Sequence, residues 1–252
     1  MKKIIIGDNI VKSFGEGDEK HNALDGVSIQ IDEGEFVSVM GPSGSGKSTL
    51  MFALSGMDGL DGGRVAFDGR DLTALKENEY ADIRRTSMGF IFQQPTFLKN
   101  LNILDNIMLP SMRDNRKNVA EITERARALM KRVGIAELEQ RDITQVSGGQ
   151  LQRAGICRAL MSYPQIIFGD EPTGALNSKS AEEIMDILSE INSEGTSVML
   201  VTHDAKIAAR TERIMFMRDG KIVSELLLQK FSGTDIDDRM KRVAARMREI
   251  GV

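Results

Sequence analysis

The sequence predicts an α/β fold in which a buried parallel sheet carries a helical insertion. Residues 36–40 are an apolar run that leads directly into a glycine-rich turn, as a strand that precedes a helix does. Three later apolar runs, at residues 89–92, 166–168 and 198–201, have the continuous hydrophobicity of parallel strands covered on both faces. Residues 94–160, approximately, contain helix-like stretches and no convincing strand, so this segment is the predicted insertion.

Shorter patterns predict the remaining strands. Residues 4–6 are apolar and predict a short strand, because a secretory signal needs about 7–15 such residues. Residues 27–32 alternate apolar and polar side chains, which indicates a strand buried on one face. Residues 64–67 end at the turn signal Asp68-Gly69 and suggest an edge strand. Residues 214–217 precede a second such signal and suggest the start of a hairpin.

Helical spacing is clearest in two stripes of apolar residues, and Gly134 follows the first as a helix-closing glycine. The first stripe comprises Val119, Ile122, Ala126, Leu129, Met130 and Val133. The second comprises Ala181, Ile184, Ile187, Leu188 and Ile191. From about residue 229 the chain is strongly charged, but some apolar residues can share one side of a short terminal helix. They are Ile236, Met240, Val243, Met247 and Ile250.

The composition excludes several classes of protein. The 252 residues are 41% hydrophobic, enough for a core in one large domain or two small ones. A formal net charge of -4 gives no general bias toward nucleic acid, which needs a basic face. The single cysteine, Cys157, cannot form an internal disulfide and fits a reducing cytoplasm. No window approaches the ~18 consecutive apolar residues of a membrane helix, so any action at a membrane is expected through a partner.

A phosphate-binding loop follows the predicted strand at residues 36–40. Its glycines let backbone N–H groups turn inward around phosphates, Lys47 adds a charge at the β/γ oxygens, and Ser48 can ligate Mg²⁺. A flexible Gly/Ser loop is the alternative, but a chance match to the full motif is on the order of one per cent. The predicted nucleotide-binding residues here are Gly41, Pro42, Ser43, Gly44, Ser45, Gly46, Lys47, Ser48 and Thr49.

Two carboxylates, Asp170 and Glu171, end the apolar run at residues 166–168. Asp170 can hold magnesium through its hydration shell, and Glu171 is the candidate general base that orients the attacking water. Alone, such a pair is more often a solvated strand end. Downstream of a complete phosphate loop, the functional interpretation is favoured.

The segment Ser147-Gly148-Gly149-Gln150 predicts a second phosphate-binding helix start. Ser147 can cap a helix, while Gly148 and Gly149 keep backbone amides open to an anion. One nucleotide bound by a single chain does not need two phosphate-binding helix starts. In two copies arranged head to tail, each nucleotide would lie between the phosphate loop of one copy and the Ser147 helix start of the other. In isolation, an ordinary capped helix is the alternative for this segment.

In this order, over about residues 3–228, the motifs resemble the nucleotide-binding subunits of ATP-binding-cassette (ABC) transporters. The resemblance implies an α/β P-loop NTPase (RecA-like) core with an antiparallel β subdomain and an inserted α-helical subdomain. It implies an ATPase domain at residues 1–228, with the insertion at about 94–160, and a charged helical extension at 229–252. ATP and Mg²⁺ are the implied cofactors.

The resemblance also assigns roles to single residues. Phe14 is similar to the aromatic residue that stacks on adenine, although a lone phenylalanine is more often a core residue. Gln93 is similar to the family's lever glutamine, which contacts Mg²⁺ and water and senses the membrane partner; its neighbour Gln94 leaves the register open by one residue. His203 matches the histidine that contacts the γ-phosphate, whereas His21 is predicted to be a surface residue. The implied catalytic residues are Glu171, His203, Gln93 and Lys47, and the implied magnesium ligands are Ser48, Gln93 and Asp170.

One position departs from the family's pattern. Gly174-Ala175-Leu176 is followed by Asn177, where the family usually has an aspartate that communicates between the two nucleotides. We expect hydrolysis to survive with altered coupling between the two sites. The alternative is that Asn177 simply caps the next helix.

The implied function is ATP hydrolysis by a homodimer that closes around two ATPs and drives separate integral membrane permease subunits at the cytoplasmic face of the inner or plasma membrane. Residues 35–44 and 83–93 look like the lipoprotein-release and macrolide-exporter branch, and residues 169–180 resemble antimicrobial-peptide resistance cassettes. A cell-division ATPase that regulates wall hydrolases through a membrane partner is the alternative. A DNA-linked ATPase is disfavoured, because the 53 residues between Gln93 and Ser147 are too few for a long coiled coil; no nucleic-acid partner is expected.

Two segments have open assignments. For the charged tail from about residue 229, three alternatives are open: it packs on the dimer partner, it docks to the membrane subunit, or it frays. The apolar residues that follow Gln93 are expected to be mostly core, with a few lining a groove for a short helix of the membrane subunit. They are Phe97, Leu98, Leu101, Ile103, Leu104, Ile107, Met108 and Leu109.

Overall fold

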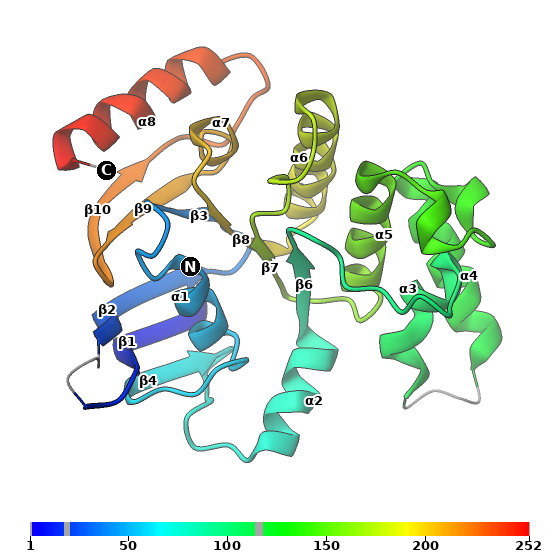
Figure 1. Ribbon diagram of the computed structural model, residues 1–252, viewed down its shortest axis with the longest axis horizontal. Coiled ribbons are helices and arrows are strands. Elements are labelled where there is room, and N and C mark those ends of the chain that lie inside the picture. The colour runs from blue at the N-terminus through cyan, green and yellow to red at the C-terminus, as the bar shows by residue number, and fades with distance from the viewer. Residues whose placement is uncertain (1, 18–20, 114–117, 252) are drawn as a thin grey trace.

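The computed structural model describes residues 2–17, 21–113 and 118–251. Its central sheet has the strand order β10-β9-β3-β8-β7-β6 in this part of the chain (Figure 1). The strands from β9 to β6 are parallel, and β9 and β10 form an antiparallel hairpin. Their bounds are β3 Phe36–Met40, β6 Met88–Phe92, β7 Ile166–Asp170, β8 Ser197–Thr202, β9 Arg213–Arg218 and β10 Lys221–Leu227. The predicted parallel strands and hairpin are confirmed, and every residue of β3 and β8 is buried, as their continuous apolar runs require.

The second sheet is antiparallel and has the order β2-β1-β4-β5. Its strands are β1 Lys3–Phe14, β2 His21–Asp32, β4 Gly62–Phe67 and β5 Arg70–Asp71. The prediction of a short strand at residues 4–6 is wrong, because β1 continues through a polar stretch whose register shifts hide any simple alternation. The predicted edge at residues 64–67 is also wrong, since Ala66 and Phe67 pair with β5 as well as with β1.

The helices are α1 Lys47–Leu54, α2 Glu77–Ser87, α3 Ile103–Met112, α4 Val119–Arg132, α5 Gly148–Leu160, α6 Ser178–Ser193, α7 Ala205–Ala208 and α8 Ile236–Ile250. Figure 1 shows α3, α4 and α5 as a helical lobe beyond the β6 side of the central sheet. Between 94 and 160, the described residues form these helices, two short 3-10 helices (Ala136–Leu138 and Ile143–Gln145) and connecting turns, with no strand. Both predicted stripes lie on helices, α4 and α6, although Val119 at the start of α4 is exposed.

Apolar clusters cover both faces of the central sheet. One cluster joins the helical lobe and α6 to strands β6, β7 and β8, and a second joins α1 and the antiparallel sheet to the other face. Cys157 belongs to the first cluster, where burial raises the pKa of its thiol to about 12. Cys157 is therefore a packing residue with a protonated, unreactive side chain.

Helix α8 packs on the chain's own sheet. Val243 is fully buried against Met40, Ile214 and Phe216, and the remaining apolar residues of the predicted stripe are partly buried against the same cluster. Figure 1 shows α8 lying across α7 and the β9–β10 hairpin. The alternative in which the tail frays is therefore wrong for its described residues.

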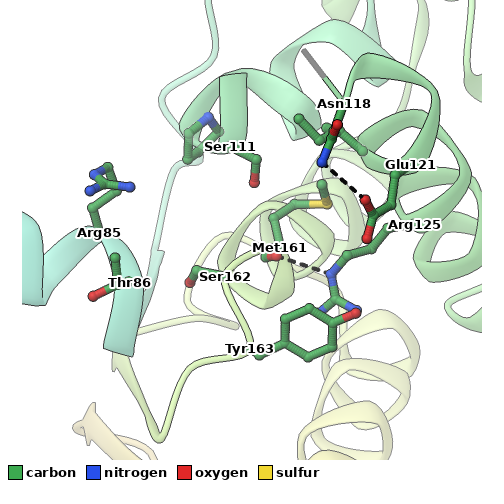
Figure 2. Close-up of a pocket in the computed structure, with 11 residues that line it drawn as sticks. Arg85, Thr86, Ser111, Asn118, Glu121, Arg125, Met161, Ser162 and Tyr163 are labelled. Atoms are coloured by element: carbon green, nitrogen blue, oxygen red, sulfur yellow. Dashed lines mark hydrogen bonds between the residues drawn. The ribbon is translucent and has the colours of Figure 1, made fainter. Parts of the chain in front are cut away.

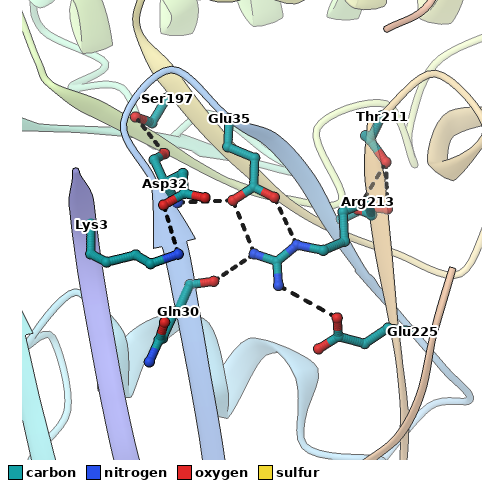
Figure 3. Close-up of polar contacts among 9 residues, drawn as sticks. Lys3, Gln30, Asp32, Glu35, Ser197, Thr211, Arg213 and Glu225 are labelled. Carbon is teal, nitrogen blue, oxygen red and sulfur yellow. Dashed lines mark hydrogen bonds and ion pairs between the residues drawn. The ribbon is translucent and has the colours of Figure 1, made fainter. Parts of the chain in front are cut away.

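An ion-pair network ties the two sheets together where β2 ends and β9 begins (Figure 3). The guanidinium of Arg213 contacts both carboxylate oxygens of Glu35, at 2.7 and 3.0 Å, and donates to the carbonyl of Gln30. Glu35 also accepts a hydrogen bond from the backbone N–H of Asp32, whose carboxylate pairs with Lys3 at 2.8 Å. Both Arg213 and Glu35 are largely buried, so the pair is held in a bidentate geometry that solvent screens little.

The glycines of the loop between β3 and α1 are required by close backbone contacts. Gly46 has φ +97°, and a Cβ there would lie 2.3 Å from the carbonyl oxygen of Ala23. A Cβ on Gly41 would lie 2.2 Å from the carbonyl oxygen of Met217. Only glycine fits at these two positions, so the loop is drawn tightly against β2 and β9 and presents the N-terminus of α1 outward.

Candidate nucleotide site

The carboxyl ends of β3, β8 and β7 lie at one edge of the central sheet because these three neighbouring strands are parallel. The glycine-rich loop follows β3, the acidic pair stands where β7 ends, and His203 follows β8. Residues separated by more than a hundred positions therefore meet at one site. Such an edge is where ligands bind in open parallel sheets.

Ser48 and Asp170 are in direct contact at this edge. The Ser48 hydroxyl donates to Asp170 Oδ1 at 2.8 Å. Burial raises the pKa of Asp170 above its ordinary value, and the nearby Glu171 adds to the increase, against the opposing effects of Ser48 and Lys47. A hydroxyl and a carboxylate at this spacing suit a hard divalent cation, whose charge would favour the ionised aspartate. In the described part of the chain no three His, Cys, Asp or Glu side chains form a metal cluster, so Mg²⁺ would rely on phosphate oxygens for other ligands.

Lys47 and Ser45 are polar groups that a phosphate would satisfy. Lys47 is largely buried and its ammonium donates to the carbonyl of Pro42 at 2.8 Å. Burial lowers the pKa of Lys47, and the carboxylates of Glu171 and Asp170 only partly offset this effect. The Ser45 hydroxyl is buried and has no hydrogen-bond partner among the described residues. Helix α1 is preceded by Gly46, which provides no side-chain cap, so the first amides of α1 are also available to an anion.

Glu171 and His203 form the next part of the site. His203 Nδ1 lies 2.8 Å from Glu171 Oε1. Glu171 has φ +45°, a left-handed conformation that is strained for a residue with a side chain and is typical of functional positions. A small cavity, about 180 Å³, lies beside the pair and extends to Gly174 and Leu176.

Gln93 lies on the other side of Glu171. A Cβ on Gly174 would be 2.8 Å from Gln93 Nε2 and 3.2 Å from Glu171 Oε2, so the amide and the carboxylate converge on this glycine. Gln93 itself is exposed just beyond β6. The structure thus places Gln93 next to the acidic pair. This position favours Gln93 over its neighbour Gln94 as the residue similar to the lever glutamine.

Phe14 lies at the end of β1 and is 43% exposed, so the alternative of a core residue is wrong. Its ring is 6.4 Å from that of His21, an exposed residue as predicted, and the Lys12 ammonium is 5.4 Å from the Phe14 ring centre. His21 begins the strand whose Ala23 carbonyl abuts Gly46. An exposed aromatic face close to the phosphate loop can stack on a base.

The second predicted phosphate-binding start is the N-terminus of α5. Ser147 caps the helix, accepting from the Gln150 N–H at 3.3 Å, while the Gln150 side chain accepts from the Ser147 N–H at 2.8 Å. Ser147 and Gly148 are exposed, and Gly149 faces the Ser180 side chain at the start of α6. Figure 1 shows α5 on the far side of β7 and β6 from α1. The two helix starts therefore stand apart within one chain.

Two residues that the sequence patterns did not single out tie α5 to the residues on either side of Gln93. Gln152 Nε2 donates to the carbonyl of Phe92 at 3.0 Å. Arg158 donates to the carbonyl of Thr96, and its guanidinium lies 4.5 Å from the centre of the Phe97 ring. Burial lowers the pKa of Arg158. A glutamine and an arginine at inward positions of an otherwise apolar helix face are the signal that could have identified these contacts.

A surface groove lies where α2, α3, α4 and the loop after α5 meet (Figure 2), with a volume of about 340 Å³. Arg85 and Thr86 line it from the end of α2, and Arg125 lines it from α4. Arg125 donates to the carbonyl of Met161 at 3.0 Å, and its guanidinium stacks 3.2 Å from the centre of the Tyr163 ring. Tyr163 is 74% exposed.

The apolar residues after Gln93 are mostly core, as expected. Phe97, Ile103, Leu104, Ile107 and Met108 are buried. Leu98 and Leu109 are exposed apolar side chains of the same stretch. No helix among the described residues has the length and apolar character of a membrane span.

A family model described as ABC transporter matches residues 24–174. The uncharacterized ABC transporter ATP-binding protein YknY of Bacillus subtilis is 42% identical over 215 residues, which is 85% of this chain and 93% of that protein. The bacitracin export ATP-binding protein BceA of Halalkalibacterium halodurans is 40% identical over 88% of each chain. The macrolide export ATP-binding/permease protein MacB of Hyphomonas neptunium is 40% identical over 86% of this chain, which spans only 34% of that longer relative.

Solved structures agree with the sequence relatives. The dimeric structure of MJ0796, described as a bacterial ABC transporter cassette, has a TM-score of 0.84 and 40% identity, covering 90% of this chain and all of that one. A second dimeric structure of MJ0796, in a post-hydrolysis state bound to ADP and Pi, has the same TM-score at 38% identity. With the phosphate loop, acidic pair and capped α5 start in one cassette fold, the chain belongs to the ABC transporter family as an ATP-binding subunit, an ATPase that uses ATP and Mg²⁺.

Proposed function

We propose that two copies of this chain close head to tail around two ATPs. Lys47, Ser48 and the loop amides of one copy would face Ser147 and Gly148 of the other. Support comes from the start of α5, which is exposed and capped and whose backbone amides suit a phosphate. This helix start lies on the far side of β7 and β6 from the phosphate loop of the same chain. A second copy can bring these groups to the nucleotide.

Within this dimer, we propose that Glu171 is the general base and that His203 orients it. Because His203 Nδ1 is bonded to Glu171, only Nε2 remains to contact the γ-phosphate. The imidazolium form donates on both nitrogens and can bridge the two groups. Gln93 is placed to orient the attacking water next to Glu171. Mg²⁺, held by Ser48, Asp170 and Gln93, would neutralise charge on the transferring phosphate.

We further propose that a short helix of a membrane permease docks in the groove between α2 and the helical lobe, which holds this subunit at the cytoplasmic face of the membrane. The groove combines an exposed aromatic ring on Tyr163 with apolar Pro110 and Ile122 and the cationic Arg85 and Arg125. Such a surface suits an amphipathic helix with an acidic end. The segment that contains Gln93 leads into the same lobe and is bonded to α5 through Phe92 and Thr96, so movement there can reach both the nucleotide and the partner site.

The transported cargo is proposed from the relatives' names. MacB is named for macrolide export and BceA for bacitracin export, which favours export of, or resistance to, antibiotics and antimicrobial peptides. Lipoprotein release and regulation of cell-wall hydrolases through a membrane partner are the alternatives. Identifying the membrane protein that co-purifies with the native complex separates them. A nucleic-acid partner is not part of this proposal, because the net charge is -4.

Glu171→Gln is predicted to bind Mg-ATP and form a lasting dimer while turnover falls by about 10²–10⁴-fold, because the amide cannot accept a proton. Steady-state ATPase assays and size-exclusion chromatography with Mg-ATP measure the two effects. Glu137→Gln, at an exposed position of the helical lobe, is the matched control and should behave like the wild type. Near-normal turnover of Glu171→Gln would exclude Glu171 as the base.

Asn177→Asp is predicted to change ATPase turnover and its dependence on ATP concentration, because it restores the charge that usually communicates between the two sites. Asn177 caps α6 by accepting from the Ser180 N–H at 2.9 Å. Aspartate makes the same cap, so the fold should be unchanged. Identical turnover and identical cooperativity in the two proteins would mean that Asn177 acts only as a cap.

Tyr163→Asn is predicted to reduce the amount of permease that co-purifies, while basal ATPase activity of the isolated subunit stays unchanged. Tyr163 has φ +54°, a conformation that asparagine tolerates, so the change removes the ring without adding strain. Val223→Ala removes exposed apolar surface from β10 and serves as the control. Full recovery of the permease with Tyr163→Asn would place its contact elsewhere.

A further inference from the structure

Arg239 of α8 is the largest fully buried side chain in the described part of the chain. A guanidinium in the interior is costly unless its N–H groups are bonded. Nε donates to the carbonyl of Ala209 at 2.5 Å, Nη2 to that of Thr211 at 2.8 Å, and Nη1 to that of Gln229 at 2.7 Å. One carboxylate, that of Asp235, lies 3.4 Å from Nη1. Arg239 is therefore bonded mainly to backbone carbonyls.

Two of these carbonyls lie at or just beyond the end of the one-turn helix α7. Ala209 is the residue that closes α7, and Thr211 follows two positions later. The other end of α7 begins at its capping residue, Asp204, which directly follows His203. A cation at the carboxyl end of a helix satisfies its free carbonyls and opposes its dipole. A single turn of helix thus connects Arg239 to the histidine that contacts Glu171.

Other contacts also hold α7, including the burial of Ile207 and Ala208 in apolar clusters. A cavity of about 480 Å³ separates α7 from α6 on one side, with Phe231 of the linker before α8 in its wall. Across this gap, Lys206 pairs with Glu182 and Arg210 pairs with Asp186, and both acidic partners are more than half exposed. Such solvent-exposed pairs contribute little. The hydrogen bonds of Arg239 are buried polar restraints on the end of α7, as is the bond that the Thr211 hydroxyl donates to the carbonyl of Ala208 at 2.8 Å.

We propose that Arg239 is a positioning residue for ATP hydrolysis: by fixing α7, it holds His203 in register with Glu171. The proposal rests on the proposed roles of His203 and Glu171 in this ATPase. It gives the C-terminal extension a function within its own chain, in addition to packing. A displacement of the histidine would affect the hydrolytic step and leave the phosphate loop and Phe14, which lie on other elements, able to bind ATP.

The test compares full-length Arg239→Met and Arg239→Lys with Val243→Ala. Val243 belongs to the same α8 interface, but its apolar side chain cannot donate a hydrogen bond to the carbonyls that Arg239 binds, so its truncation reports loss of packing alone. We expect kcat to fall on the order of tenfold in Arg239→Met with KM for Mg-ATP nearly unchanged. Arg239→Lys keeps the positive charge but not the planar set of N–H donors, so its kcat should lie between those of Arg239→Met and the wild type. Val243→Ala should keep the wild-type kcat.

Two further measurements separate positioning from stability. In a His203→Ala background, Arg239→Met should lower kcat no further, because its effect passes through His203. The chain contains two histidines, so the ring NMR signals of His203 can be assigned, and Arg239→Lys should shift them while Val243→Ala should not. This second readout applies even if Arg239→Met does not fold.

The proposal is overturned if folded Arg239→Met and Arg239→Lys keep the wild-type kcat, if Val243→Ala lowers kcat equally, or if the effect persists without His203. Unchanged His203 signals in Arg239→Lys would overturn it as well. Failure of the underlying function gives a different result: His203→Ala itself would then hydrolyse ATP at the normal rate, whatever residue stands at position 239.

Discussion

The parallel alignment of β3, β8 and β7 is the constraint on which the site depends. It places the ends of three neighbouring strands at one edge, where the Ser48–Asp170 hydrogen bond and the Glu171–His203 contact form without any cross-link. Glycines at positions 41 and 46 then let the loop press against the backbone of Met217 and Ala23. The electrostatics follow from this packing, since burial disfavours the charged forms of both Lys47 and Asp170, and a magnesium-bound phosphate complements both.

The helical lobe adds a second constraint. Its helix α5 carries a capped, exposed N-terminus, yet Gln152 and Arg158 bond it to the segment that contains Gln93. A segment next to Glu171, the proposed general base, is thereby joined to the helix start that we assign to the opposite nucleotide. The groove around Tyr163 lies at the base of the same lobe. The proposed nucleotide contact and the proposed permease contact therefore lie on the same helical lobe, and a movement of this lobe would affect both.

Much of this arrangement could be predicted because its signals are local. Apolar runs that end in glycines or carboxylates identify β3 and β7, and one short motif identifies the phosphate loop. Helix α2 was not predicted, because none of its residues is buried and no apolar stripe marks it. The length of β1 was missed because its polar half pairs through shifted registers. The contacts of Arg239 could not be predicted either, since its partners are carbonyls distant in sequence, and the sequence shows only a charge.

Cross-linking between two copies tests whether the phosphate loop of one copy meets the start of α5 of the other at a shared nucleotide. One Glu171→Gln protein carries Ser43→Cys in the phosphate loop, and the other carries Ser147→Cys at the start of α5; both positions are exposed. The native Cys157 is buried, with a pKa raised to about 12, and does not compete. With a short bismaleimide, we expect a cross-linked pair of the two proteins only in saturating Mg-ATP. No cross-linked pair is expected when Glu137→Cys replaces Ser147→Cys. Absence of the cross-linked pair in saturating Mg-ATP would contradict a nucleotide held between two copies of this chain.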